Sequence, residues 1–297
     1  MVIYLAGGIA GNCKPQWQEM IKALYGDEEK LDLYLAGTQG RRWCVDVYLA
    51  GIQGRTKGFV LDDQLKDINK VDIAILESFF YADEWTEKII PLLDRFLLDS
   101  GAFTFMNSEK DKSKVNFDEY LTKYINFINN NNVKYFFELD IDSIVGYDEV
   151  LKLRERLERE TRKKCIPVWH KSRGLDEWVK LTKEYDYIAI GGIVTKEIKR
   201  TEYKYFTKLL KIAKENNCKV HGLGFTNLKG LEKYKFYSVD STSWTTGNRF
   251  GSVYKFDGRT MVKYHKQEGQ RLSNAREVAI HNFNEWVKFQ KYAKKFL

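Results

Sequence analysis

Residues 187–194 read YIAIGGIV, a short apolar run that ends in two glycines. A run of this length, rich in β-branched residues, is typical of a buried strand and too short for a buried helix. The amphipathic stretch EYKYFTKLLKIAKENN (202–217) follows it, and a second apolar run, KVHGLGFT (219–226), comes next. A strand, a helix and a strand in this order predict a parallel pair joined by a right-handed crossover.

The same alternation extends over most of the chain. Five further strands are predicted at residues 72–80, 96–105, 133–142, 165–170 and 236–244, and three further helices at 116–132, 146–164 and 175–185. These seven strands, with one from the N-terminal region, predict an α/β fold of the (β/α)8 TIM-like barrel type. An open doubly wound sheet is the alternative, in which only the strands beside the switch point would share a site.

The first sixty residues repeat one tetrapeptide. Tyr-Leu-Ala-Gly occurs three times, and a second glycine follows each copy three or four residues later. Duplication of a strand-and-turn unit that builds scaffold is the favoured interpretation, and a backbone lying close to a sugar or base is the alternative. We expect one copy, residues 47–54, to supply a barrel strand.

The pattern divides the chain into three regions. Residues 1–60 carry the repeats and contribute to the barrel, residues 61–250 form the barrel core with the active site, and residues 251–297 form a hairpin and a basic helix. Asp-Gly at 257–258 predicts the hairpin turn. Ser273 is the predicted N-cap of the amphipathic helix, which packs on the barrel or belongs to a polyanion-binding face.

The composition indicates a basic protein without membrane segments. The net charge of +8 favours polyanionic partners such as nucleic acid, although Lys-rich solvated faces produce the same excess. No apolar run approaches the roughly 18 residues that span a bilayer, and no export signal is visible. We therefore expect a cytoplasmic protein with no membrane partner. The four cysteines lie far apart, which predicts free thiols and no thiolate metal site.

Polar residues and glycines stand at the ends of the predicted strands. LLDSGAFTF ends one strand with Asp99, and FYSVDSTSWTTGNRFG ends another with Asp240. YIAIGGIV and KVHGLGFT end in glycines, where a flat ligand can lie against bare backbone. Because the carboxyl ends of barrel strands meet at one mouth, we expect these groups to lie together. Each segment alone also occurs in ordinary turns between a strand and a helix.

In this order, the segments resemble the tRNA-guanine transglycosylases and the related 7-deazaguanine DNA transglycosylases of phages and bacteria. The matching segments are Asp99-Ser100-Gly101-Ala102-Phe103, Asp140, Ala189-Ile190-Gly191-Gly192, Gly222-Leu223-Gly224 and Asp240. The resemblance covers roughly residues 90–250. It implies a base exchange at C1′ of a nucleotide, without a cofactor.

The resemblance also implies the roles of individual residues. Asp240 would attack C1′ and expel guanine, and Asp99 would carry the proton to the leaving base and from the incoming base. Asp140 would accept two N–H donors of the guanine edge, with Asp142 as its rival on the same strand. His170 stands where the family commonly has a base-contacting glutamine. The implied substrate-binding residues are Ser100, Asp140, Asp142, His170, Gly191, Gly192 and Gly224.

The sequence departs from the tRNA enzymes in one important respect. Those enzymes carry a Cys-x-Cys-x-x-Cys zinc site with a later histidine, and this sequence has no such pattern. We therefore expect no metal, and DNA rather than tRNA as the partner, with a free modified base as co-substrate. The nucleic-acid backbone is expected to meet Arg41, Arg42, Arg55 and Arg249. The oligomeric state is left open.

Two alternatives remain at this stage. Water could replace the incoming base, which would make the protein a DNA glycosylase that removes a modified base, as in phage conflict. The chain could also be a nucleic-acid-binding barrel without catalysis.

Overall fold

The computed structural model describes residues 45–52, 71–101, 104, 116–225, 227–246, 251–265 and 274–297, and the backbone of residues 4–5 and 34–35. The chain forms two compact units, Met1–Trp43 and Cys44–Leu297. In the first unit, β1 (Tyr4–Leu5) pairs in parallel with β2 (Tyr34–Leu35). Equivalent residues of two Tyr-Leu-Ala-Gly copies are therefore in register, and the third copy lies in a strand of the second unit.

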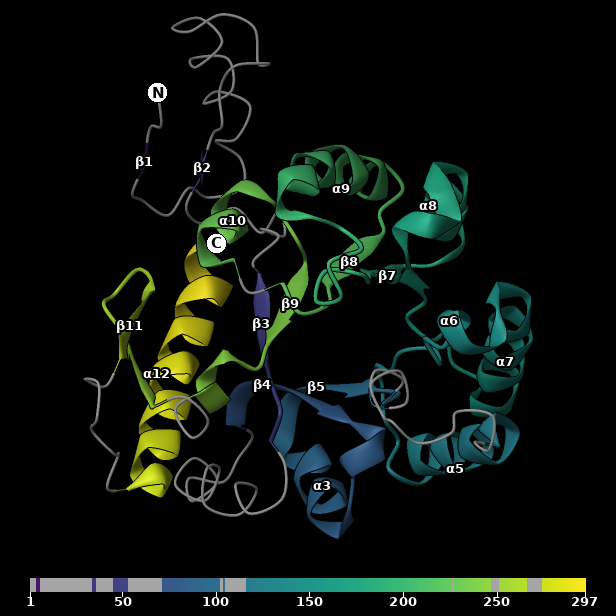
Figure 1. Ribbon diagram of the computed structural model, residues 1–297, viewed down its shortest axis with the longest axis horizontal. Coiled ribbons are helices and arrows are strands. Elements are labelled where there is room, and N and C mark those ends of the chain that lie inside the picture. The colour runs from purple at the N-terminus through teal and green to yellow at the C-terminus, as the bar shows by residue number, and fades with distance from the viewer. Residues whose placement is uncertain are drawn as a thin grey trace, which may run out of the picture. The chain divides into compact units, whose positions relative to one another are not determined.

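The second unit is built on a seven-stranded parallel sheet. Its strands are β3 (Asp46–Ala50), β4 (Val71–Ser78), β5 (Leu93–Asp99), β6 (Val168–Trp169), β7 (Tyr187–Ile190), β8 (Lys219–Gly222) and β9 (Ser238–Ser241). The order is β5-β4-β3-β9-β8-β7-β6, which follows the chain around a circle and is interrupted only between β5 and β6. The sheet curls into a half-barrel (Figure 1), consistent with a TIM-like α/β fold.

Residues 136–138 lie at the interruption between β5 and β6. Phe136 and Phe137 form isolated parallel bridges to Leu98 of β5 and to Ile166 just before β6. The Phe137 N–H donates to the Leu98 carbonyl at 3.0 Å, and the Ile166 N–H donates to the Phe136 carbonyl at 2.8 Å. The strand predicted over 133–142 is therefore wrong in extent, because the chain turns beyond residue 138 into α6 (Asp142–Val145).

Helices are arranged around the outside of the curled sheet (Figure 1). They are α3 (Glu84–Ile89), α5 (Phe117–Asn130), α7 (Tyr147–Thr161), α8 (Gly174–Glu184), α9 (Phe206–Glu215), α10 (Leu228–Lys233) and α12 (Ala275–Phe296). The four helices predicted between strands are confirmed, with α5, α7 and α9 shorter than predicted and α8 shifted by one residue toward the N-terminus. The first part of the last of them, Arg200–Tyr205, is a 3-10 helix.

The C-terminal region has the predicted elements with one corrected boundary. Strands β10 (Ser252–Phe256) and β11 (Met261–His265) pair in antiparallel register around the Asp-Gly turn. The N-cap of α12 is Asn274 and not Ser273, since the Asn274 side chain accepts from the Glu277 N–H at 3.2 Å. None of the described helices combines the length and apolar character needed to cross a membrane.

The inner face of the sheet determines which side chains can reach the site. Successive side chains of a strand point to opposite faces, and Leu97, Val168 and Ala189 belong to a buried cluster separate from the larger cluster that includes the helices. Two residues further along, the same strands or the turns after them carry Asp99, His170 and Gly191. The strand pattern therefore directs polar groups to the carboxyl end of the sheet.

Candidate active site

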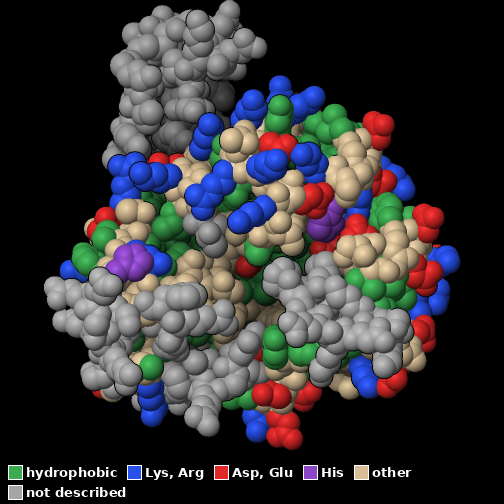
Figure 2. All heavy atoms as spheres, in the orientation of Figure 1, with side chains coloured by type: hydrophobic (Ala, Val, Ile, Leu, Met, Phe, Trp, Pro, Cys, Tyr) green, Lys and Arg blue, Asp and Glu red, His purple; other side chains and the backbone are tan. Residues whose placement is uncertain are grey.

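A cavity of about 1420 Å³ lies at the carboxyl end of the sheet, and Figure 2 shows a hollow at the centre of one face. Seven of the nine predicted catalytic and substrate-binding residues line this cavity, namely Asp99, Asp140, His170, Gly191, Gly192, Gly224 and Asp240. Ser100 and Asp142 do not line it. Arg41, Arg42, Arg55 and Arg249 lie outside the described residues.

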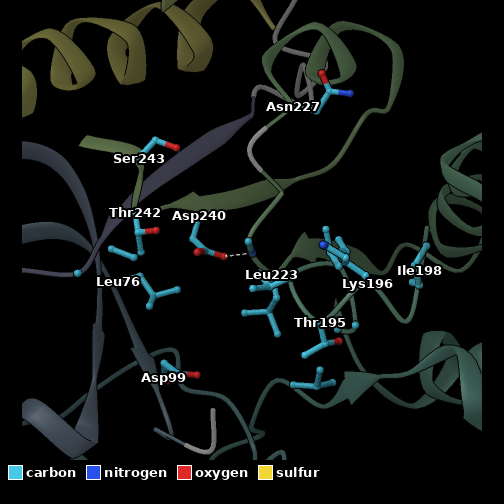
Figure 3. Close-up of a pocket in the computed structure, with 18 of the residues that line it drawn as sticks. Leu76, Asp99, Thr195, Lys196, Ile198, Leu223, Asn227, Asp240, Thr242 and Ser243 are labelled. Atoms are coloured by element: carbon cyan, nitrogen blue, oxygen red, sulfur yellow. Dashed lines mark hydrogen bonds between the residues drawn. The ribbon is translucent and has the colours of Figure 1, made fainter. Parts of the chain in front are cut away.

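Asp240 enters the cavity from β9 with one carboxylate oxygen held in place. Its Oδ1 accepts from the Gly224 N–H at 2.5 Å (Figure 3) and from His221 Nε2 at 3.2 Å. No donor among the described residues reaches Oδ2. The carboxylate is thus oriented through one oxygen while the other is available to a reacting carbon.

His221 connects Asp240 to a buried chain of hydrogen bonds. The ring is fully buried, and because a carboxylate only accepts, Nε2 donates to Asp240. Nδ1 lies 2.6 Å from Ser238 Oγ, which lies 2.5 Å from the Tyr187 hydroxyl. Burial raises the pKa of Tyr187 well above its usual value, so the phenol keeps its proton. In the neutral ring, protons then point from Tyr187 through Ser238 toward His221, and the chain fixes which nitrogen faces Asp240.

Gly224 presents its N–H to Asp240 because its backbone is left-handed. Its φ is +68°, a region that residues with a Cβ rarely adopt. A Cβ at this position would also lie 2.1 Å from Val194 Cγ2. Glycine is therefore required here both by conformation and by space, and the prediction that this residue touches substrate stays a prediction.

Asp99 faces the same opening from the end of β5 (Figure 3). Its Oδ2 accepts from the Gly101 N–H at 2.9 Å. Burial, together with the nearby charges of Asp240 and Asp140, raises the pKa of Asp99 to about 6, although the hydrogen bond from Gly101 acts in the opposite direction. Asp99 can consequently exchange a proton near neutral pH, as a general acid and base must.

Asp140 is held by a charged histidine. His170 Nε2 lies 2.8 Å and 3.0 Å from the two oxygens of Asp140, and Nδ1 lies 2.9 Å from Glu197 Oε2. Burial lowers the pKa of His170, but the hydrogen bonds with Asp140 and Glu197 and the charges of Asp140 and Asp142 outweigh it and raise the pKa to about 9. Both ring nitrogens are engaged, so His170 orients Asp140 in this structure.

Asp142 belongs to a neighbouring ion-pair cluster. It begins α6 and accepts from Arg173 Nη2 at 3.0 Å, while Arg173 Nη1 approaches Glu138 at 3.4 Å. Glu138 is fully buried and also accepts from Arg154 at 2.5 Å. These arginines balance the carboxylates behind the cavity wall.

Asp140, Asp142 and His170 bring one potential metal-ligand atom each within 4.8 Å of one another. His170 already lies between two carboxylates, and Arg173 contacts Asp142, so cationic side chains compensate these acids. The arrangement fits an ion-pair cluster better than a cation site. Cys165 and Cys218 are buried free thiols outside the cavity lining.

The two glycines after β7 make room for this cluster. A Cβ at Gly191 would lie 2.7 Å from His170 Cε1, and one at Gly192 would lie 2.6 Å from Glu197 Oε2. Packing against His170 and Glu197 therefore explains both glycines, and contact with a base stays a prediction.

The remaining predicted residue and several unpredicted ones complete the picture. Ser100 is buried behind the cavity, and its carbonyl accepts from the Tyr120 hydroxyl at 2.7 Å. His221, Glu197 and Arg173 were not among the predicted site residues. For His221 a signal existed in the sequence, since it lies within the strand-end segment KVHGLGFT, from which Gly224 was predicted as a site residue.

No family model and no curated protein matches the chain.

Proposed function

We propose that this protein breaks the N-glycosidic bond of guanine nucleotides in DNA and installs a 7-deazaguanine through an aspartyl-glycosyl intermediate. Asp240 is the nucleophile and Asp99 is the acid and base. The observation that carries the proposal is that these two carboxylates, from strands far apart in the sequence, line one cavity. Their different hydrogen bonding supports different roles.

We further propose that the fold is a (β/α)8 barrel in which residues 136–138 take the place of an eighth strand. The support is the pair of parallel bridges that this segment makes to Leu98 and Ile166. The Glu138 N–H also donates to the Ile166 carbonyl at 3.1 Å. Such a barrel brings all strand ends to one mouth.

In the first step, Asp240 Oδ2 bonds to C1′ while the bond between C1′ and N9 of guanine breaks. Positive charge develops at C1′ in the transition state, and a carboxylate beside it stabilises that charge. The Asp99 carboxyl gives its proton to the departing base, so guanine leaves as a neutral molecule. Asp99 is then ionised, and the sugar is esterified to Asp240.

In the second step, the incoming base gives its N9 proton to the Asp99 carboxylate. N9 bonds to C1′ as the ester bond to Asp240 breaks, which restores both side chains to their starting states. Protons and charges balance over the cycle without a cofactor. The Gly224 N–H and His221 stabilise the Asp240 carboxylate when it leaves.

Asp140 is the residue proposed to read the base. A carboxylate has about four lone-pair sites, so its contact with His170 leaves acceptors for the N1–H and amino group of guanine. In duplex DNA the nucleotide must leave the stack before C1′ is accessible.

The experiment that tests this proposal supplies DNA and an isotope-labelled 7-deazaguanine to the protein and analyses nucleosides and free bases by mass spectrometry. Label in DNA with stoichiometric release of guanine supports the proposal. Abasic sites without incorporated label identify water as the acceptor and the protein as a glycosylase. Binding with no released base from DNAs carrying normal or modified guanine contradicts catalysis at this bond.

Two variants make the assay specific. Asp240→Asn is expected to abolish both release and incorporation. Asp118→Asn, the same chemical change at an exposed carboxylate on α5, is the matched control and is expected to keep both.

A further inference from the structure

We infer that four cations at the mouth of the cavity bind successive phosphates of the DNA strand whose nucleotide occupies the cavity. These residues, the cationic rim, are Lys196, Lys199, Arg200 and Lys229. They lie on the segments that follow β7 and β8, and all four are exposed. The identity of the strand rests on the proposed function, whereas the polyanion site itself is tested independently below.

The rim cations make no ion pair with a carboxylate of the described residues. Several cations elsewhere on the surface form such ion pairs. Lys171 pairs with Glu202 at 2.5 Å, and Lys123 pairs with Glu119 on α5 at 2.7 Å. The charge of the rim is therefore available to a ligand, as is the charge of some lysines on the outer helices, but only the rim cations line the cavity.

The charges of the cavity are layered. Asp99, Asp140 and Asp240 line its depth, and the rim lines the same cavity from the exposed segments. Figure 2 shows Lys and Arg side chains gathered beside the hollow. A nucleotide has the complementary layering, because its phosphates are anionic and its C1′ becomes positive during bond cleavage. The layering thus fixes the orientation, with phosphates outward.

Neutral hydrogen-bonding side chains line the same cavity as the rim cations. Thr195, Asn227 and Thr242 also line the cavity, and in Figure 3 Thr195 lies near Lys196 and Thr242 near Asp240. Hydroxyl and amide groups of this kind donate to phosphate oxygens in protein–DNA contacts and fix the register of the strand. Four cations exceed what the single charge of one phosphodiester requires, so a polynucleotide fits this mouth better than a free nucleoside or mononucleotide.

The test removes the rim charges and compares the result with an equal charge loss elsewhere. The rim variant carries Lys196→Asn, Lys199→Gln, Arg200→Gln and Lys229→Gln. Asparagine is used at 196 because Lys196 has a φ of +63°, and Asn tolerates the left-handed region best among residues with a Cβ. The control variant carries Lys123→Gln, Lys152→Gln, Arg159→Gln and Lys211→Gln, all exposed on outer helices.

Binding of a fluorescent guanine-containing single-stranded oligonucleotide is measured by anisotropy over a series of NaCl concentrations. Each phosphate contact contributes about 0.7 to the slope of log K against log salt for single strands. In the rim variant the magnitude of this slope is expected to fall by about 2 to 3, and the affinity at moderate salt is expected to fall on the order of 30-fold. The control variant is expected to change affinity less than about 3-fold, by screened long-range charge alone.

Three outcomes overturn the inference. They are unchanged affinity and slope in the rim variant, an equal loss in the control variant, and tighter binding of polyglutamate than of the oligonucleotide. All proteins in the assay carry Asp240→Asn, so binding is read without turnover. If the protein exchanges no base but its salt slope depends on the rim residues, the proposed function fails and this inference stands. If it exchanges bases but its DNA binding does not depend on the rim residues, only this inference fails.

Discussion

The two ends of the sheet use charged residues in opposite ways. At the amino end, Arg95 of β5 donates to Asp46 of β3 and, at 2.8 Å, to Asp72 of β4, and Lys294 of α12 also contacts Asp72 at 2.8 Å. At the carboxyl end of the same β5, Asp99 makes no ion pair with a described cation. Asp46 and Asp72 are thus neutralised by their neighbours at one end, whereas Asp99 is left uncompensated in the cavity at the other, although Asp140 of the same cavity pairs with His170.

The pKa values follow this difference. Burial raises the pKa of Asp72, but hydrogen bonding to Lys294 and the charge of Arg95 outweigh it, and the net pKa is lowered. The pKa of Asp99 is raised to about 6 by burial and by two neighbouring carboxylates. The comparison teaches that an aspartate at a strand end indicates chemistry only where the surrounding charges leave it uncompensated.

The largest expected effect comes from Asp240→Asn, which removes the nucleophile at the uncompensated end. Single-turnover release of guanine is expected to fall by at least ~10⁴-fold, since loss of a nucleophile is rarely rescued by neighbours. The amide oxygen can still accept from Gly224 and His221, so the free energy of unfolding should change little. A fall of less than about 10-fold would assign the attack to another group.

Asp99→Asn removes the acid and base and is expected to slow release by ~10²–10⁴-fold. The acid form of Asp99 predominates below its pKa of about 6, so glycosyl-enzyme formation by the wild type should decline as pH rises through that value. Single-turnover rates over a pH series check this. A wild-type profile flat from pH 5 to 8, or one shared with Asp99→Asn, contradicts the assignment.

Arg95→Met tests the amino end, where no effect on chemistry is expected. The change leaves Asp46 without this cation and Asp72 with Lys294 alone, and the free energy of unfolding should drop by about 1–3 kcal/mol. Urea unfolding measures this drop, and the single-turnover rate per folded molecule should stay within ~2-fold. If Arg95→Met lost activity without losing stability, the amino end of the sheet would also contribute to the chemistry, which contradicts the comparison.

The smallest effect concerns the stability cost of Asp99. Its pKa is raised in the folded state, so the folded protein loses stability as pH rises from the unfolded value near 4 through about 6. Relative to wild type, Asp99→Asn should therefore gain about 1–2 kcal/mol between pH 4 and pH 8, after allowance for solvent in the cavity. Unfolding curves at the two pH values measure it, and a constant difference would show that Asp99 ionises without cost.

Much of the sheet was predictable from local pattern. Apolar runs with inward-pointing Leu97 and Ala189 predict strands, and the alternation places Asp99 at the inner mouth. The strand predicted over 133–142 was too long, because its apolar residues continue beyond the point where the backbone turns. Ser273 and Asn274 are adjacent and both suit an N-cap, so only the hydrogen bond to Glu277 distinguishes them.

The partners of the site residues were not predictable in the same way. The contacts of His221 with Asp240 and of His170 with Glu197 join residues brought together by the curl of the sheet. No spacing in the sequence encodes them. Likewise, the sequence pattern does not distinguish Asp140 from Asp142. Only the tertiary contacts show that Asp140 lines the cavity and that Asp142 pairs with Arg173.

The central claim is that Asp240 becomes covalently bound to a sugar. Denaturing the protein after brief mixing with guanine-containing DNA, followed by proteolysis and mass spectrometry, tests it most directly. The account predicts a peptide carrying a deoxyribose-linked nucleotide on Asp240, absent from Asp240→Asn and chased away by added 7-deazaguanine. Base release in the same reaction with no adduct, or an adduct on another residue, would contradict it.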